Sequence, residues 1–330
     1  MKNFIKLLFF IFYVFSTYNL FAVEKTSTAV FTGEEYSIYV TYLDSVNQGD
    51  AICVKMDIIP SRKTMKEPFA ETQGILIFDN NRKSEFFIME ETKNSRQNSN
   101  TAISMCALIP ISTWQESGNY NLSVMYSAYG KDYMKFSLPI KITSKDFISE
   151  TIELNAANTS IKTDNSPTRM KQIDKLNKIL STKNFESVYQ KKNFTPPTDA
   201  TRRTSFFGDR RVYSYITGES STSLHHGIDY GIPTGTPVYA CGNGVVVLAE
   251  ERVSTGWSVV IEHLPGLYSL YYHLDSYSVK EGQYIEQGQQ LGVSGATGLA
   301  TGPHLHWEMR LNGESVSPDF FTNELGLLFQ

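Results

Sequence analysis

The sequence predicts a mainly β protein in which two β domains are joined by a helical connector. Short runs rich in aromatic and β-branched residues recur along residues 29–143, and many of them alternate apolar with polar positions. Turn-forming residues such as Asn47-Gln48-Gly49-Asp50 separate these runs. Beyond Pro196 the chain is again strand-rich and is punctuated by glycines, and it has no apolar periodicity of helical length.

Length and composition are those of an ordinary globular protein. A chain of 330 residues can form two domains with cores of normal size. The hydrophobic content of 41% is also normal. A formal net charge of -4, with no run rich in Lys and Arg, argues against a nucleic-acid-binding protein.

The three cysteines, Cys53, Cys106 and Cys241, are too few for a disulfide framework and are odd in number. Cys53 and Cys106 could form a pair if they meet in one domain. Each lies in an apolar run, however, where a free buried cysteine serves equally well. A pair of free thiols is the favoured interpretation.

Residues 1–22 have the pattern of a secretory signal peptide. A short basic start precedes an apolar run at 7–15, and Leu20-Phe21-Ala22 fits a cleavage site with a small last residue. The apolar run is shorter than the roughly 20 residues of a bilayer span, which favours cleavage over retention as an anchor. We therefore expect an exported protein that is located in the periplasm or cell envelope, or is secreted.

Residues 24–145 are expected to form an antiparallel β-sandwich of immunoglobulin-like type. Seven or eight short strands at this spacing are typical of such sandwiches, and examples are 36–42, 52–58 and 74–78. Because none of these runs has a spacing typical of a catalytic site, a structural or positioning role is favoured over a specific binding role.

Residues 146–196 form the expected connector. The stretch 155–165 is polar and predicted to be irregular. Ser166-Pro167 then resembles an N-cap followed by proline at the first helical position. Apolar residues follow at helical spacing and predict one amphipathic helix: Met170, Ile173, Leu176 and Leu180. Docking of this helix on a neighbouring domain is favoured over binding of a partner.

All six histidines lie between His225 and His306. The stretch opens with His225-His226-Gly227-Ile228-Asp229 and closes with His304-Leu305-His306. Histidine is the commonest metal ligand and the usual proton carrier at neutral pH. This concentration, with an aspartate at fixed spacing, predicts a metal-dependent site.

The spacing of these residues constrains the geometry of the site. In a strand, His304 and His306 point to one face, roughly 6.6 Å apart, so both can reach one metal ion and its water. His225 and Asp229 also share a face, but about 13 Å apart in an extended chain. We therefore predict a kinked strand with its bend at Gly227, which has no side chain to block the metal.

Together, His225, Asp229 and one histidine of the closing pair offer two nitrogens and one carboxylate oxygen. Three protein ligands with a fourth position open to water are typical of catalytic zinc sites. The other closing histidine and His273 would then handle protons near the metal.

From Phe207 to Pro318 the sequence resembles the lysostaphin/LytM-type zinc endopeptidases, which cut peptidoglycan peptides. The matching motifs occur in the family's order: His225-x-x-x-Asp229, Pro233-x-Gly235-x-Pro237-Val238, Gly244-x-Val246, Tyr271-x-His273-Leu274 and Gly295-x-Thr297-Gly298-x-x-Thr301-Gly302-Pro303-His304-Leu305-His306-Trp307-Glu308. The resemblance implies that residues 197–330 form a compact all-β zinc metallopeptidase domain.

By this resemblance, His225, Asp229 and His306 bind Zn²⁺, while His304 and His273 act on water and the reacting peptide. Zinc lowers the pKa of its water from about 15.7 toward 7 and polarises the scissile carbonyl. A neutral histidine nearby can take the proton as the water attacks. We favour His304 as this base, although the sequence does not separate its role from that of His273.

Two histidines are interpreted as structural. In an extended chain the His226 side chain points to the opposite face from that of His225. His226 is therefore expected to be a neighbour of the site rather than a ligand. His263 precedes the turn Leu264-Pro265-Gly266.

Four other residues near these motifs have no assigned catalytic role. Tyr271 is expected to pack in the core or at its rim rather than to contact substrate, and Cys241 is expected to be a small buried residue. Arg210 and Arg211 could each pair with acids or meet a substrate carboxylate.

The sequence therefore predicts an exported zinc metalloendopeptidase that hydrolyses amide bonds in peptidoglycan peptide cross-links. One alternative is a non-catalytic wall-binding protein of the same fold that activates another wall hydrolase. Another is an adhesin or scaffold, with other cell-envelope proteins as partners. The sequence leaves open which wall bond is cut, whether the N-terminal region shields the metal, and the oligomeric state.

Overall fold

The structure is a computed structural model that describes residues 14–15, 26–60, 72–79, 82–93 and 101–328. The expected signal peptide lies outside these residues except for β1 (Val14–Phe15). The chain divides into two compact units. The first comprises Met1–Ser45, Cys53–Ala107 and Tyr120–Ile140, and the second Val46–Ile52, Leu108–Asn119 and Lys141–Gln330. The predicted mainly β class is confirmed.

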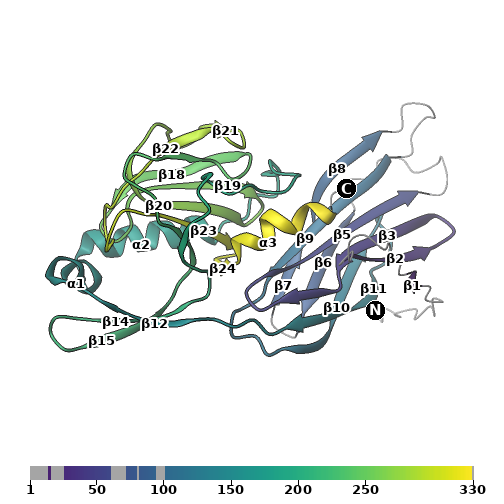
Figure 1. The fold of residues 1–330 in the computed structure, drawn as a ribbon. Coiled ribbons are helices and arrows are strands. Elements are labelled where there is room, and N and C mark those ends of the chain that lie inside the picture. The colour runs from purple at the N-terminus through teal and green to yellow at the C-terminus, as the bar shows by residue number, and fades with distance from the viewer. Residues whose placement is uncertain (1–13, 16–25, 61–71, 80–81, 94–100, 329–330) are drawn as a thin grey trace. The chain divides into compact units, whose positions relative to one another are not determined.

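Two sheets make up the N-terminal β region (Figure 1). The first has the order β1-β2-β3-β5-β9-β8, with β2 (Thr26–Thr32), β3 (Tyr36–Leu43), β5 (Ala51–Pro60), β8 (Phe87–Lys93) and β9 (Thr101–Pro110). The second has the order β4-β11-β10-β6-β7, with β4 (Ser45–Asn47), β6 (Gln73–Phe78), β7 (Arg82–Glu85), β10 (Gly118–Ser127) and β11 (Met134–Thr143). Neighbours such as β2–β3 and β6–β10 are antiparallel.

The two sheets pack against each other, as predicted for a sandwich. The rings of Phe31 on β2 and Phe136 on β11 lie 4.4 Å apart between their centroids. Along β3, Ile38 and Val40 are buried while Tyr39 between them is exposed, which is the period-two alternation of a strand with one core face. Assignment to the immunoglobulin type stays a prediction.

Cys53 on β5 and Cys106 on β9 do meet in this unit. Their Sγ atoms lie 3.4 Å apart, and both residues are free, fully buried thiols. Burial raises the pKa of the Cys53 thiol, which keeps it protonated.

The second unit contains a ten-stranded sheet whose central order is β13-β16-β23-β20-β19-β18-β21 (Figure 1). Its strands are β13 (Arg203–Ser205), β16 (Gly227–Tyr230), β17 (Pro237–Tyr239), β18 (Gly244–Arg252), β19 (Gly256–Leu264), β20 (Leu267–Tyr277), β21 (Tyr284–Ile285), β22 (Gln290–Ser294), β23 (Leu305–Leu311) and β24 (Glu314–Val316). The expectation that 197–330 is all β is wrong at its end, where α3 (Pro318–Asn323) and the 3₁₀ turn η1 (Leu325–Leu328) follow. These segments are too short to show helical periodicity in the sequence.

The connector is more structured than predicted. It contains β12 (Ser149–Glu153), α1 (Ala156–Thr163) and α2 (Pro167–Leu180). The prediction that 155–165 is irregular is wrong, because Asn155 caps α1 by accepting a hydrogen bond from the Asn158 backbone N–H. This helix has a polar sequence and gains support from elsewhere in the fold, since Nδ2 of buried Asn158 donates to the Ala300 carbonyl.

Helix α2 begins where the sequence predicts, with the Ser166 hydroxyl accepting from the Arg169 backbone N–H. Its apolar side chains pack on strands β18, β19 and β20, in a cluster of Leu176, Ile179, Leu180, Leu248, Val260, Tyr268, Leu270 and Tyr272. Docking of the helix is therefore confirmed, although Met170 at its first turn is exposed. Of the helices in the described residues, none is long and apolar enough to cross a bilayer.

Strand β12 forms a separate small sheet with β14 (Arg210–Ser214) and β15 (Ser220–Leu224). The pairing of β12 with β14 is parallel and that of β14 with β15 is antiparallel. The chain leaves this sheet after Leu224 and enters the ten-stranded sheet at Gly227. His225 and His226 therefore occupy the passage between the two sheets.

Candidate metal centre

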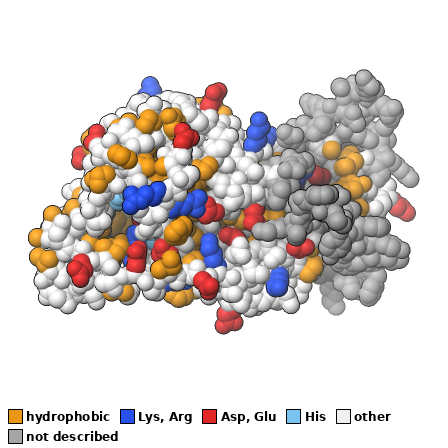
Figure 2. Space-filling view, in the orientation of Figure 1, with side chains coloured by type: hydrophobic (Ala, Val, Ile, Leu, Met, Phe, Trp, Pro, Cys, Tyr) orange, Lys and Arg blue, Asp and Glu red, His pale blue; other side chains and the backbone are white. Residues whose placement is uncertain are grey.

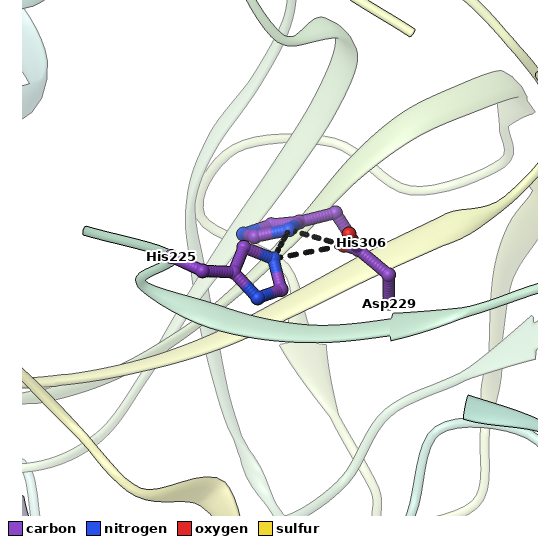
Figure 3. Close-up of side chains that lie close together, drawn as sticks. All are labelled: His225, Asp229 and His306. Carbon is purple, nitrogen blue, oxygen red and sulfur yellow. Dashed lines mark hydrogen bonds and ion pairs between the residues drawn. The ribbon is translucent and has the colours of Figure 1, made fainter. Parts of the chain in front are cut away.

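The predicted ligands come from two paired strands and the segment before them: Asp229 lies on β16, His306 on β23, and His225 just before β16 (Figure 3). Strand β16 pairs antiparallel with β23, which places Asp229 opposite His306. On its other side β23 pairs with β20, which places His306 opposite Tyr272. The Tyr272 ring stacks on that of His306, with centroids 5.6 Å apart, and Tyr272 belongs to the cluster that α2 covers. The position of the His306 ring is thus fixed by its stacking on a residue of the hydrophobic core.

His225 is fixed by the chain that precedes β14. Its backbone N–H donates to the Asp209 carbonyl, and its own carbonyl accepts from Gly208. The Nδ1–H group donates to the Phe206 carbonyl at 2.7 Å. A carbonyl can only accept, so Nε2 is left unprotonated in the neutral ring and faces Asp229.

The predicted kink at Gly227 is wrong in position. The change of direction lies at His225-His226, between β15 and β16, and Gly227 is the first residue of a regular strand. A Cβ at Gly227 would collide with the Trp307 carbonyl on β23. The position is restricted to glycine by close packing of the strands rather than by access to a metal.

The three candidate ligand atoms lie slightly closer together than the ligand atoms of a tetrahedral ion. Asp229 Oδ1 lies 2.7 Å from His306 Nδ1 and 3.1 Å from His225 Nε2 (Figure 3). The two nitrogens lie 3.1 Å apart. Zinc bonds of about 2.0–2.1 Å would place tetrahedral ligand atoms ~3.3 Å from one another, so a small outward adjustment would admit the ion.

A buried carboxylate that the sequence interpretation passed over orients His306. Glu308 Oε1 accepts from His306 Nε2 at 3.0 Å, which leaves Nδ1 for the metal. The other oxygen, Oε2, accepts from Arg310 Nε at 2.8 Å. Glu308 lies two residues after His306 on the same face of β23, and this spacing is the feature from which it could have been found.

The charges of this cluster depend on one another. Burial alone would lower the pKa of His306, but the carboxylates of Asp229 and Glu308 raise it to about 9. Burial alone would raise the pKa of Asp229, but His306 and His225 hold it well below its usual range. Burial would likewise raise the pKa of Glu308, but Arg310 and His306 hold it well below its usual range, so both carboxylates are ionised at neutral pH and can attract a cation.

His304 and His273 lie beside the ligands with their Nε2 atoms unprotonated. Nδ1–H of His304 donates to the Gly302 carbonyl and that of His273 to the Thr297 carbonyl, each at 2.8 Å. Their ring centroids are 4.6 Å apart, and His304 Nε2 lies 3.9 Å from Asp229 Oδ1. Burial lowers the pKa of both rings, to about 3 for His273, so both are neutral at pH 7.

A bulge in β20 aims His273 at the site. Two residues, Tyr272 and His273, occupy the space opposite Ser258 on β19, because the pairing shifts between Trp257 and Val259. His273 has a φ of 60°, and its N–H donates to the Thr255 carbonyl. A non-glycine residue held in this region marks a conformation that the surrounding structure imposes.

The cluster opens into a cavity of about 510 Å³. Besides the histidines, its walls include Glu150, Ile152 and Leu154 of the connector, together with Leu299 and Thr301. Figure 2 shows small areas of histidine surface close to Lys and Arg side chains on this face. A cavity of about 670 Å³ near Thr195 and Tyr239 shares no lining residue with it.

The remaining sequence candidates lie outside the ligand cluster. His226 Nδ1 contacts the Ser315 hydroxyl at 3.0 Å, and His263 is completely buried. Tyr271 is also fully buried, and its hydroxyl accepts from the Cys241 backbone N–H. Core packing is therefore confirmed for Tyr271, and Cys241 is a small buried residue as expected.

The two arginines differ. Arg211 pairs with acids, donating to Asp229 Oδ2 at 2.8 Å and to Glu150 Oε1 at 2.9 Å. Arg210 donates to the Gly208 carbonyl at 3.1 Å. Within the part of the chain that the structure describes, it contacts none of the candidate metal ligands.

The segment that contains these residues is similar to known proteins. Residues 223–318 match the model of Peptidase family M23. Peptidoglycan DD-endopeptidase ShyA of Vibrio cholerae serotype O1 is 38% identical over 135 residues, which are 41% of this chain and 31% of ShyA. DD-carboxypeptidase/endopeptidase Mpg of Neisseria meningitidis serogroup B is 45% identical over 95 residues, 29% of this chain and 22% of Mpg. Each match spans less than a third of the relative.

A solved structure from Pseudomonas aeruginosa, described as an M23 peptidase, shares the fold over a larger part of this chain than ShyA and Mpg match. It aligns with a TM-score of 0.51 and 22% identity over 76% of this chain and 87% of its own. The family resemblance expected from the sequence motifs is confirmed.

Proposed function

We propose that this chain, whose residues 223–318 form a peptidase family M23 domain, is a zinc-dependent endopeptidase of peptidoglycan. The observation that carries the proposal is the convergence of His225 Nε2, Asp229 Oδ1 and His306 Nδ1, each pair within 3.1 Å, beside two neutral histidines. Two imidazoles and one carboxylate with an open side form a catalytic rather than a structural zinc ligand set.

The chemistry divides between the ion and the surrounding side chains. Zinc, when bound, supplies Lewis acidity that polarises the scissile carbonyl and makes water more acidic. His304 has its unprotonated Nε2 beside the ligand oxygen and can take the proton of the attacking water. His273, whose ring centroid lies 4.6 Å from that of His304, can receive this proton and then donate a hydrogen bond to the developing oxyanion or pass the proton to the leaving amine.

The proposed substrate is the cross-linked peptide of peptidoglycan, with hydrolysis at an amide bond. The names of ShyA and Mpg support this choice, as does the cavity of about 510 Å³ into which the histidine cluster opens. We propose that the protein is exported and acts in the periplasm or cell envelope or after secretion, because residues 1–22 have the pattern of a signal peptide.

Digestion of defined cross-linked muropeptides by the purified full chain, followed by mass spectrometry, tests the activity. We expect cleavage that a chelator stops and added zinc restores, and no cleavage by His306→Ala. Binding of wall fragments without hydrolysis under any metal condition would instead favour the non-catalytic wall-binding or activating protein.

Sequencing the N-terminus of the protein recovered from cell fractions tests export. We expect a mature chain that begins after Ala22 in the periplasmic or extracellular fraction. Recovery of the intact N-terminus from the cytoplasm would refute export without bearing on the activity.

A further inference from the structure

We propose that Arg211 and Glu150 are positioning residues of the metal centre, and that they hold Asp229 so that one carboxylate oxygen faces the ion. This inference rests on the proposed zinc site. It concerns two residues that precede the segment matched by the family model, which begins at residue 223.

The contacts divide the two oxygens of Asp229 between different partners. Oδ1 faces His306 Nδ1 and His225 Nε2 at 2.7 and 3.1 Å. Oδ2 accepts from Arg211 Nη2 at 2.8 Å. The Arg211 and Asp229 side chains are only 12% and 8% exposed, so water screens this pair weakly.

Glu150 holds the other side of the same guanidinium. Arg211 Nε donates to Glu150 Oε1 at 2.9 Å. The parallel pairing of β12 and β14 places Glu150 directly opposite Arg211, so the register of the small sheet sets the contact. Arg211 is thereby fixed by two acids from two directions, and it stands as a rigid fork rather than a mobile side chain.

The consequence concerns how the carboxylate can bind. An aspartate that is free to rotate can offer both oxygens to an ion and occupy the position that a catalytic site keeps open. The bond from Arg211 to Oδ2 fixes the rotation of the carboxylate, so Oδ1 is the oxygen that faces the two histidines. Outer partners of this kind orient the ligands of metal sites, and their loss typically weakens metal binding about 10–100-fold.

The arrangement also extends the site into the connector. Glu150 lies on β12, and Ile152 and Leu154 of the same segment line the metal cavity. A domain that began at residue 197 would keep every predicted ligand but lose the acid that fixes Arg211. The connector therefore contributes to the metal site and is more than a spacer.

Zinc affinity of the full chain, measured by competition with a chelator of known affinity, tests the proposal. We expect about 10–100-fold weaker binding for Arg211→Met. Arg211→Lys should lose a similar factor, because lysine keeps the charge but not the fork. Glu150→Gln should shift affinity in the same direction by a smaller factor, and this shift should vanish in an Arg211→Met background.

Arg203→Lys is the matched control. Arg203 lies in the same unit and pairs with Asp319 through two contacts of 2.8 Å. Among the described residues it contacts none of the candidate metal ligands. Its zinc affinity should be unchanged. Thermal unfolding of each metal-free variant measures any general loss of stability, which the competition assay would otherwise include.

The visible spectrum of the cobalt-substituted chain gives a readout that a purely structural role would not change. A second carboxylate oxygen on the ion raises its coordination number, so the absorption of the Arg211 variants should weaken relative to the unmodified chain. Unchanged or tighter zinc binding with an unchanged spectrum would overturn the proposal.

These measurements contain no wall substrate. Failure of the unmodified chain to cleave peptidoglycan would therefore refute the proposed function alone, whereas unchanged metal binding in the Arg211 variants would refute the positioning role alone. If the unmodified chain binds no zinc, both proposals fail.

Discussion

The second unit contains two buried histidine environments, a cluster around His306 and the single residue His263, and they differ in their neighbours. His306 contacts the carboxylates of Asp229 and Glu308 and lines an open cavity. His263 is fully buried, but Nδ1 faces the Asn243 carbonyl at 2.6 Å and Nε2 faces the Ser269 hydroxyl at 2.7 Å. Its ring packs edge-on against Phe194, and it does not line the metal cavity.

The pKa values express this difference. Adjacent carboxylates raise the pKa of His306 to about 9 despite its burial, whereas burial lowers that of His263 to about 4. Burial of a histidine therefore does not by itself indicate a metal site. The informative features are paired carboxylates and an opening to solvent.

The largest expected effect is the loss of a ligand. His306→Ala should abolish zinc retention and reduce endopeptidase activity to background, because two ligands do not hold the ion. Metal content after dialysis and muropeptide release would be measured together. His263→Gln is the control, because His263 is buried away from the candidate ligands, and this variant should keep its zinc. Equal loss of zinc from both variants would contradict the proposed difference between the two histidines.

Removal of the proposed base should separate metal binding from catalysis. His304→Ala is expected to keep zinc and lower turnover about 10²–10⁴-fold, the range for a general base. The same measurements on His273→Ala would rank the two histidines. An active His304→Ala protein would overturn its assignment as the base.

The carboxylate behind His306 should affect affinity more modestly. Glu308→Gln is expected to bind zinc about 10–100-fold more weakly, because it no longer accepts a charge-assisted bond from His306. Glu262→Gln is a matched control, because Glu262 is also buried but accepts a hydrogen bond from Ser187 and contacts none of the candidate ligands among the described residues. Equal zinc affinity in the two variants would show that Glu308 has no orienting role.

The smallest effect should be confined to stability. The folded-state pKa of His263, about 4, lies below its usual value of 6.5, so the unfolded chain binds the proton first as pH falls. This contribution is complete above pH 6.5 and is lost toward pH 4, at about 1.4 kcal/mol per pH unit.

Urea unfolding of the metal-free chain at pH 7 and pH 5 would measure this contribution. Between these values the unmodified protein should lose about 2 kcal/mol more of its free energy of unfolding than His263→Gln. Parallel losses would mean that His263 is already protonated in the folded protein at pH 5.

Much of this protein follows from local patterns in its sequence. The period-two alternation predicts the strands, and the capping of α2 by Ser166 predicts its start, because both depend on residues close together in the chain. The motifs likewise pick out His225, Asp229 and His306, the three residues that the fold brings together.

Other features depend on residues far apart in the chain. Glu150 and Arg211 are separated by 61 positions, and their contact follows from the parallel pairing of β12 with β14, which leaves no periodic pattern in the sequence. The bend at His225-His226 arises likewise, because β15 and β16 belong to different sheets.

The sequence by itself determined which side chains make up the candidate metal site. Tertiary structure alone decided which nitrogen of each histidine faces it and which oxygen of Asp229 is free, since these depend on the hydrogen bonds made by the opposite atoms. Those partners are a carbonyl, a glutamate and an arginine that only folding brings within reach.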